Sequence, residues 1–339
     1  MKRLVWYKRP DLHFLHVLKG LFIIGGVIFA LLCIIIVLLN KPYPEKITYG
    51  VTYSYLYAQA LGLDPRQTYL DIIQDLKVKN IRLPIYWSRV EKSVNYYDFS
   101  EVDWQIQQAE KHRVNLIVAI GKKLPRWPEC YLPDHLRYTD KKTQDKYLLN
   151  FIQIIVNRYK SSPSIIMWQV ENEPFLPFGE CQPETDLLAY KRKVSLVRTL
   201  DTRPVSTADS GELSEWLRTG ALVDILGISL YRDSWSPLFG NFIYPFPPAI
   251  YALKAKLVSF IVPKIIVSEL QMEPWADKFI GELSIEKQQK LFPLQKFLDN
   301  LNYGQRAGFD TIYLWGVEWW ALQKQNKYND YWEASRPLF

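Results

Sequence analysis

Short apolar runs recur along this chain at regular intervals, and longer amphipathic or polar segments separate them. Each run is four to eight residues long and is bounded by Gly, Pro, Asn, Asp or Ser, which is the pattern of a buried strand. From residue 47 onward the pattern predicts eight strands, at 47–52, 80–86, 115–120, 165–168, 204–207, 223–230, 264–269 and 309–315.

The segments between these runs carry helix signals. Asp64 followed by Pro65 predicts a capped helix start, and Ser100 predicts a cap for a helix that runs through Glu110. Further helices are expected at 147–159, 187–199, 212–218, 249–260, 284–301 and 330–337. Strand and helix thus alternate eight times, which predicts an α/β fold with a parallel sheet closed into a (β/α)8 TIM barrel. An open doubly wound sheet is the second candidate, but residues 53–61 lack the Gly-rich phosphate turn expected after its first strand.

The N-terminal region differs from the rest of the chain. Gly20–Leu39 is an uncharged stretch of 20 residues. As a helix it spans about 30 Å, the thickness of a bilayer core. A cleavable signal peptide is the alternative, but its apolar region usually has about 7–15 residues, and no small-x-small cleavage site follows Leu39.

Charge indicates the topology of this segment. Five basic residues precede the apolar stretch against one acid, Asp11, so the N-terminus is expected in the cytoplasm; they are Lys2, Arg3, Lys8, Arg9 and Lys19. We therefore expect a cytoplasmic tail at 1–19, a transmembrane anchor at 20–39, a linker at 40–46 and a barrel at 47–339. The protein would be a single-pass protein of the cell membrane whose barrel lies outside the cytoplasm.

The net charge of +7 does not indicate a nucleic-acid partner. Residues 1–46 hold seven basic and two acidic residues, which leaves 35 basic and 33 acidic residues for the predicted barrel. A barrel that is nearly neutral lacks the basic surface that nucleic-acid binding requires. The lipid bilayer is the partner that residues 20–39 predict.

Acidic residues stand where two of the predicted strands end. The fourth apolar run leads into Glu-Asn-Glu at 171–173, and Lys264–Glu269 ends in a glutamate. In a (β/α)8 barrel the carboxyl ends of the strands form the active face. Two glutamates at this face predict the carboxylate pair of a glycosidase.

Other residues at the predicted strand ends are candidates for substrate binding, and each also has an ordinary structural interpretation. Arg82 is expected to orient Glu269, although a structural ion pair is the alternative. Tyr231 and Trp315 could be core aromatics, and Glu273 is the main rival of Glu269. Further candidates without a definite role are Glu171, His135 and the tryptophans 127, 235, 275, 319 and 320.

The strongest indication of function comes from motifs. Residues 168–174, WQVENEP, resemble the strand-four motif of clan A glycoside hydrolases, in which an Asn-Glu pair supplies the acid/base; the versions in family 42 β-galactosidases and family 5 cellulases are most similar. Residues 266–269, IVSE, resemble the clan's strand-seven nucleophile. Arg82, Tyr231 and Trp315 resemble its strand-two Arg, strand-six Tyr and strand-eight Trp. The likeness covers about residues 47–320.

The resemblance implies a retaining mechanism with Glu173 as acid/base and Glu269 as nucleophile. It also implies substrate binding by Arg82, Asn172, Tyr231 and Trp315, to which the loop residue Trp127 is added as a candidate. Family 5 enzymes often have a His near the end of strand three, where this chain has Ile120-Gly121-Lys122-Lys123. The resemblance therefore does not predict that this chain acts on a family 5 substrate. No cofactor is expected, and no Cys/His cluster has metal-ligand spacing.

The sequence thus predicts a membrane-anchored retaining β-glycosidase that acts on oligo- or polysaccharides. A transglycosylase on the same scaffold and a carbohydrate-binding barrel without turnover remain open. An aldolase would require a lysine at a strand end, for which Lys122 is the nearest candidate.

The cysteines allow one structural hypothesis. Cys33 lies in the predicted span, while Cys130 and Cys181 fall in the loops after the third and fourth strands. Outside the cytoplasm such a pair can oxidise. A Cys130–Cys181 disulfide and two unrelated thiols are both compatible with the sequence, and a Cα separation above about 7 Å would exclude the disulfide.

Overall fold

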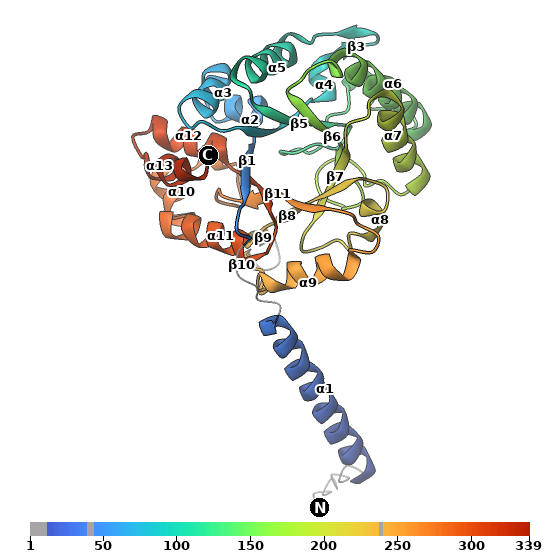
Figure 1. Ribbon diagram of the computed structural model, residues 1–339, viewed down its shortest axis with the longest axis vertical. Helices are drawn as coiled ribbons and strands as arrows, with labels where there is room; N and C mark the ends of the chain where they lie inside the picture. Colours follow the sequence, from blue (N-terminus) through green and yellow to red (C-terminus); the bar gives the residue numbers. More distant parts are fainter. Residues whose placement is uncertain (1–11, 39–43, 237–239) are drawn as a thin grey trace, which may run out of the picture.

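The computed structural model describes residues 12–38, 44–236 and 240–339. Eight parallel strands form a closed barrel, and helices surround it (Figure 1). This confirms the predicted (β/α)8 fold. The barrel order is β1-β12-β11-β8-β7-β6-β5-β2. The strands are β1 Thr48–Thr52, β2 Asn80–Pro84, β5 Asn115–Ile120, β6 Ile165–Asn172, β7 Val205–Ser210, β8 Ile225–Leu230, β11 Ile265–Gln271 and β12 Thr311–Trp315.

The helices around the barrel largely follow the predicted segments. Asp64 caps α3 as expected, because its side chain accepts a hydrogen bond from the Gln67 N–H. Ser100, by contrast, is the first residue of α5, and its N–H donates to Asp98. The helices are α2 Tyr55–Ala60, α3 Pro65–Gln74, α4 Trp87–Val90, α5 Ser100–His112, α6 Lys141–Tyr159, α7 Leu187–Leu200, α8 Leu217–Gly220, α9 Ala249–Val258, α10 Ile285–Leu291, α11 Leu294–Arg306, α12 Val317–Gln325 and α13 Asp330–Ser335.

Several helical segments differ from the prediction, and the short helices α2 and α4 were not expected. The helix expected at 284–301 is divided into α10 and α11 at Pro293, which has no N–H to continue a helix. Helix α12 was not predicted, and its Trp319 and Trp320 are completely buried. These two tryptophans therefore belong to the core. Two hairpins were also not predicted: β3 Glu91–Ser93 with β4 Tyr96–Tyr97, and β9 Asp233–Ser236 with β10 Gly240–Ile243.

Strand β6 has an irregularity just where its polar end begins. Trp168 and Val170 belong to the core between barrel and helices, whereas Met167 packs inside the barrel with residues of β5, β11 and β12. Regular alternation would then turn residue 172 outward. However, the three steps from Gln169 to Asn172 match only two steps on β7, so one residue is extra. This bulge turns Asn172 into the barrel.

Strand β11 has a corresponding bulge. Ile266 packs inside the barrel, and Val267 and Leu270 pack outside it. Val267 pairs with one residue of β8 and Glu269 with the next, so that Ser268 is the extra residue. The bulge reverses the alternation and turns Glu269 toward the barrel interior, which a regular strand would not do.

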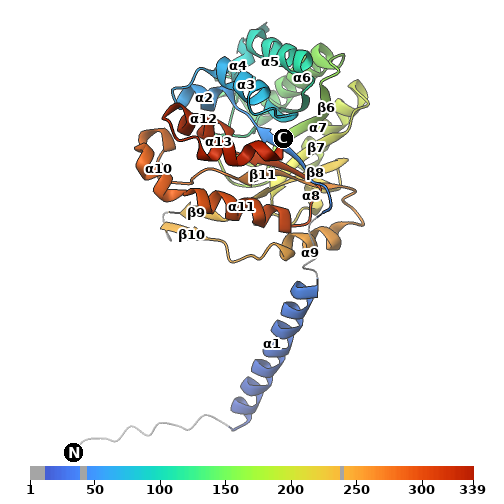
Figure 2. The same cartoon turned by 60° about the vertical axis from the view of Figure 1, so that its left-hand side comes forward.

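Helix α1, Leu12–Leu38, projects away from the barrel and contacts it beside α9 (Figures 1 and 2). Within it, His16–Ile35 is long and apolar enough to cross a membrane. This stretch begins four residues before the predicted one. Leu39, residues 40–43 and the charged residues Lys2, Arg3, Lys8, Arg9 and Asp11 lie outside the described residues.

Candidate active site

Arg82, the central residue of β2, connects three strands at the mouth of the barrel. Its side chain is completely buried. Nη1 donates to Glu269 Oε1 at 2.6 Å and Nη2 donates to Asn172 Oδ1 at 2.6 Å. Nε donates to Gln169 Oε1 at 2.7 Å. One guanidinium group therefore holds the inward-turned residues of both bulges.

Glu269 has a second hydrogen-bond donor. The hydroxyl of Tyr231, which follows β8, donates to Oε2 at 3.0 Å, so each carboxylate oxygen of Glu269 accepts one hydrogen bond. The two donors come from β2 and from the residue after β8, and together they fix the orientation of the carboxylate. The structure thus brings together Arg82, Tyr231 and Glu269, three of the residues predicted to form the site.

Glu173 lies next to this network but in a different environment. Its carboxyl is buried, and Oε1 accepts a hydrogen bond from Ser229 Oγ at 3.1 Å. Ser229 is also the residue of β8 that pairs with Glu269, so one strand position lies against both candidate carboxyls. Burial first, and then the negative charge of Glu269, raise the pKa of Glu173 to about 8, while Lys123 acts in the opposite direction.

The two glutamates therefore lie in different chemical environments. Glu269 is held by an arginine and a tyrosine, whereas Glu173 retains its proton at neutral pH because of its raised pKa. Two neighbouring carboxyls in environments that differ in this way can act as nucleophile and proton donor.

Glu171, the other acid on β6, points away from this pair. Its Oε2 accepts hydrogen bonds from the N–H groups of Lys122 and Lys123, at 2.9 and 2.7 Å. Its Oε1 lies 3.0 Å from Nζ of Lys193 on α7. Glu171 is the extra residue of the β6 bulge, with φ of +61°, and its partners give it a structural role.

Glu273, the rival of Glu269, is part of a separate buried ion cluster. Arg126 donates to Glu273, and to Glu318 of α12 at 2.5 Å. The guanidinium lies between the rings of Tyr57 and Trp315, at 3.8 and 4.0 Å from their centroids. Burial raises the pKa of both glutamates, and the charge of Arg126 opposes this effect. Glu273 is thus committed to Arg126, a loop residue that the sequence did not single out.

The candidate aromatic residues fall into two environments. Trp127 is 68% exposed, and a row of ring contacts connects it through Phe178 and Trp275 to Tyr231, which binds Glu269. Trp315 is only 6% exposed, and Arg126 covers one of its faces. The row Trp127–Phe178–Trp275–Tyr231 thus leads from the exposed Trp127 to Glu269.

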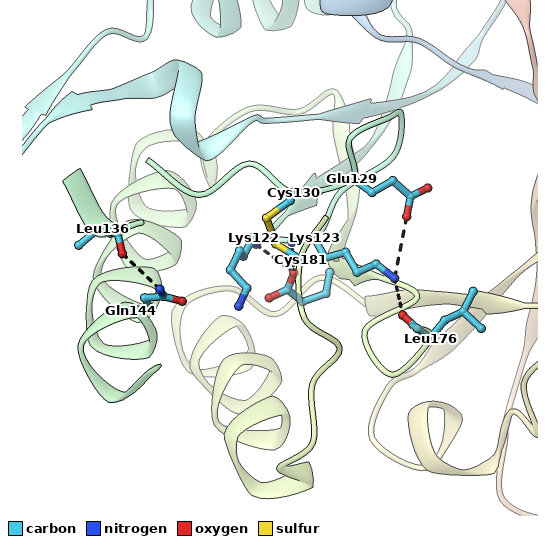
Figure 3. Close-up of a disulfide and its surroundings, with 9 residues drawn as sticks. Lys122, Lys123, Glu129, Cys130, Leu136, Gln144, Leu176 and Cys181 are labelled. Atoms are coloured by element: carbon cyan, nitrogen blue, oxygen red, sulfur yellow. Dashed lines mark hydrogen bonds and ion pairs between the residues drawn. A yellow bond between two sulfur atoms is a disulfide. The ribbon is translucent and has the colours of Figure 1, made fainter. Parts of the chain in front are cut away.

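Cys130 and Cys181 form a disulfide, with their Cα atoms 4.8 Å apart (Figure 3). This confirms the hypothesis drawn from their places in the two loops. The bond joins the loop after β5 to the loop after β6, and it lies next to Lys122 and Lys123. Figure 3 also shows that these two lysines extend in different directions, with Lys123 pointing toward Glu129 and Leu176.

Several residues of the site were not predicted. Lys123, Glu129, Gln169 and Ser229 are all buried around the candidate carboxyls. Strand alternation could have indicated that the Gln169 side chain faces the same side as Met167, two residues earlier. Lys123 and Glu129 lie in a loop, where periodicity does not indicate which way a side chain points. His135, one of the open candidates, lies 3.4 Å from Glu91 and packs against Tyr147.

A closed parallel barrel with an Asn-Glu pair ending β6 and an arginine-bound Glu on β11 has the arrangement of clan A glycoside hydrolases. The comparisons agree with this class. The family described as Cellulase (glycosyl hydrolase family 5) matches residues 47–203. The chain therefore has a barrel similar to that of glycoside hydrolase family 5. A search of the curated proteins found no match.

Solved structures with a similar fold include glycoside hydrolases. An exo-β-1,4-mannosidase from Opitutaceae bacterium strain TAV5 has a TM-score of 0.56 at 12% identity, over 87% of this chain and 60% of that one. A β-galactosidase from Bacillus circulans sp. alkalophilus has 0.54 at 15% identity, over 81% and 51%. GH5_18 from Bifidobacterium longum subsp. longum has 0.52 at 11% identity, over 80% and 70%. The chain spans about half the length of the β-galactosidase, and these likenesses concern the fold.

Proposed function

We propose that this protein is a membrane-anchored glycosidase that cleaves β-glycosidic bonds with retention of configuration. The observation that carries the proposal is the contrast between the two buried glutamates: Glu269 is bound by Arg82 and Tyr231, while Glu173 beside it has a raised pKa. The family 5 match over residues 47–203 supports a carbohydrate substrate.

In the proposed reaction Glu269 attacks the anomeric carbon while Glu173 gives its proton to the leaving oxygen. Glu173, now ionised, then takes a proton from water, and the resulting hydroxide releases the sugar from Glu269. Asn172 accepts a bond from Arg82 through Oδ1, and its buried Nδ2 has no partner among the described residues. This amide is suited to donate to the sugar 2-OH, a contact that positions the anomeric carbon.

Turnover and stereochemistry test this proposal directly. The full chain in detergent micelles is expected to hydrolyse at least one 4-nitrophenyl β-glycoside among the glucoside, galactoside, mannoside and cellobioside. Proton NMR of the first product should show the β-anomer before mutarotation, and an α-anomer would refute retention. Transfer of the sugar to added oligosaccharide in preference to water would identify a transglycosylase. Glycan binding without hydrolysis by the wild-type chain would favour the non-catalytic alternative.

We assign α1 to a bilayer span. Apolar N-terminal helices occur both in anchors and in signal sequences, but the stretch His16–Ile35 has 20 residues, longer than the apolar region of a typical signal peptide. Helix α1 meets the barrel at α9. The apolar side chains of Leu257, on α9, and Phe260, just after it, are exposed there, which supports a position of the barrel near the lipid.

The expected topology places the barrel outside the cytoplasm, because basic residues precede the span. Protease added to intact cells that express a C-terminally tagged chain should remove the tag signal and release barrel fragments. A cytoplasmic marker protein must stay intact in the same sample. Protection of the tag until the cells are lysed would show the reverse orientation. A mature chain that begins after residue 39 would identify α1 as a signal peptide.

A further inference from the structure

Glu129 is a third buried carboxyl at the mouth of the barrel. It lies in the loop between β5 and α6 and is 7% exposed. Its Oε2 lies 3.9 Å from Nζ of Lys123, which donates at 2.9 Å to the backbone carbonyls of Glu173 and Leu176 (Figure 3). A single lysine thus connects Glu129 to the candidate acid/base.

The backbone around Glu129 is held in place from both sides. The next residue, Cys130, is disulfide-bonded to Cys181, and the Glu180 N–H donates to the Pro128 carbonyl at 2.9 Å. A Cβ at Gly179 would lie 2.8 Å from Glu129 Cβ, so only glycine allows this approach. Glu129 itself has φ of +56°, a left-handed conformation that a residue other than glycine keeps only when its surroundings enforce it.

One oxygen of this carboxyl has no hydrogen-bond partner in the described part of the chain. Oε2 of Glu129 is buried and accepts no hydrogen bond from the described residues, because Lys123 is too distant for one. Burial and the charges of Glu173 and Glu269 raise the pKa of Glu129, and Lys123 and Arg82 oppose them. Glu129 is near Glu173, because Lys123 lies 3.9 Å from Glu129 Oε2 and donates to the Glu173 carbonyl. A buried oxygen without a partner is unfavourable unless a ligand supplies the partner.

We propose that Glu129 binds a hydroxyl group of the saccharide held between Glu173 and Glu269, an inference that rests on the function proposed above. The Oε2 atom accepts from the hydroxyl or, when the carboxyl is protonated, donates to it. Arg82 is already bonded to Glu269, and Lys123 to two carbonyls. Both of these cations therefore already have partners among the described residues, which makes a neutral saccharide the matching class and a uronic acid unfavourable.

The competing explanation is that Glu129 serves only to balance the charge of Lys123. Two variants separate these roles. Glu129→Gln removes the charge but keeps the size, and Glu129→Asp keeps the charge near Lys123 but withdraws the oxygen from the substrate. Glu180→Gln is the matched control, since Glu180 is an exposed acid in the neighbouring loop whose backbone contact is retained.

The experiment uses the full chain in detergent micelles and the neutral 4-nitrophenyl β-glycoside that it hydrolyses fastest, together with the 3-, 4- and 6-deoxy analogues and the corresponding β-uronide. In both Glu129 variants kcat/KM is expected to fall by about 10- to 100-fold, mainly because KM rises. A loss of this size corresponds to one hydrogen bond to a charged group. Against one deoxy analogue this loss should vanish, because the hydroxyl that Glu129 binds is missing. The uronide should be a poor substrate for wild type and better for Glu129→Gln.

Equal losses on every deoxy analogue, or wild-type kcat/KM in both variants, would overturn the Glu129 proposal while leaving the proposed function in place. If Glu129→Gln does not fold, the kcat/KM values of Glu129→Asp on the parent glycoside and its deoxy analogues test the proposal in the same way. If the wild-type chain hydrolyses no glycoside, the proposed function fails and the Glu129 proposal fails with it.

Discussion

Replacing Glu269 with Gln is expected to reduce turnover of every aryl β-glycoside by on the order of 10⁴-fold or more, the scale on which covalent catalysis is lost with its nucleophile. Glutamine keeps the size of the side chain; its one oxygen can still accept from Arg82, and its NH2 group can donate to the Tyr231 hydroxyl. It cannot form the glycosyl ester. The loss should be as large for substrates with good leaving groups as for poor ones, since both require the nucleophile. Steady-state kinetics with a series of aryl glycosides measures this.

The rival acid provides the control. Glu273→Gln should lower the melting temperature, because it removes one of the two carboxylates that balance the buried Arg126. It should nevertheless retain activity within about tenfold of wild type, since Glu273 is committed to that ion pair. Full activity of Glu269→Gln together with an inactive but folded Glu273→Gln would reverse the assignment.

Replacing Glu173 with Ala is expected to give a different pattern. For substrates with poor leaving groups kcat/KM should fall by about 10²- to 10⁴-fold, because no proton reaches the departing oxygen. For 2,4-dinitrophenyl glycosides the first step should be spared and the glycosyl-enzyme should accumulate. Added azide should then accelerate turnover and yield a β-glycosyl azide. Absence of rescue and of a leaving-group dependence would contradict the acid/base role of Glu173.

The pH profile tests the same residue independently. The first step requires the protonated form of Glu173, so kcat/KM should be maintained below the raised pKa of about 8 and should decline as the pH rises through it. With 2,4-dinitrophenyl glycosides this alkaline decline should be absent in Glu173→Ala, because the proton is no longer needed. A decline that persists unchanged in the variant would assign it to another group. Glu180→Gln serves again as the control and should keep the wild-type profile.

The alternation of apolar runs and amphipathic segments was sufficient to predict the barrel. Buried parallel strands such as Asn115–Ile120 are continuous apolar runs, and a capped start such as Asp64-Pro65 depends on neighbouring residues alone. The predicted strand boundaries were less accurate where a contact with another part of the chain determines the end of the strand. The polar end of β6 was not recognised as strand because its pairing with β7 continues through Asn172.

For the candidate site, the sequence by itself determined which residue types stand near the strand ends: Arg82, Asn172 with Glu173, Tyr231 and Glu269. It could not determine where they point. Regular alternation would turn Asn172 and Glu269 outward, and only the bulges, which arise from pairing with β7 and β8, turn both toward Arg82.

The sequence distinguished Glu269, Glu173, Glu171 and Glu273 only by their likeness to clan A motifs, and the tertiary structure supplied the physical differences between them. Their differences come from burial and from partners contributed by other strands and loops: Arg82 and Tyr231, Ser229, Lys193, and Arg126. Glu129 became a candidate for the same reason. Its position depends on a disulfide and on the close approach of Gly179, contacts between two loops whose distance in space no local pattern encodes.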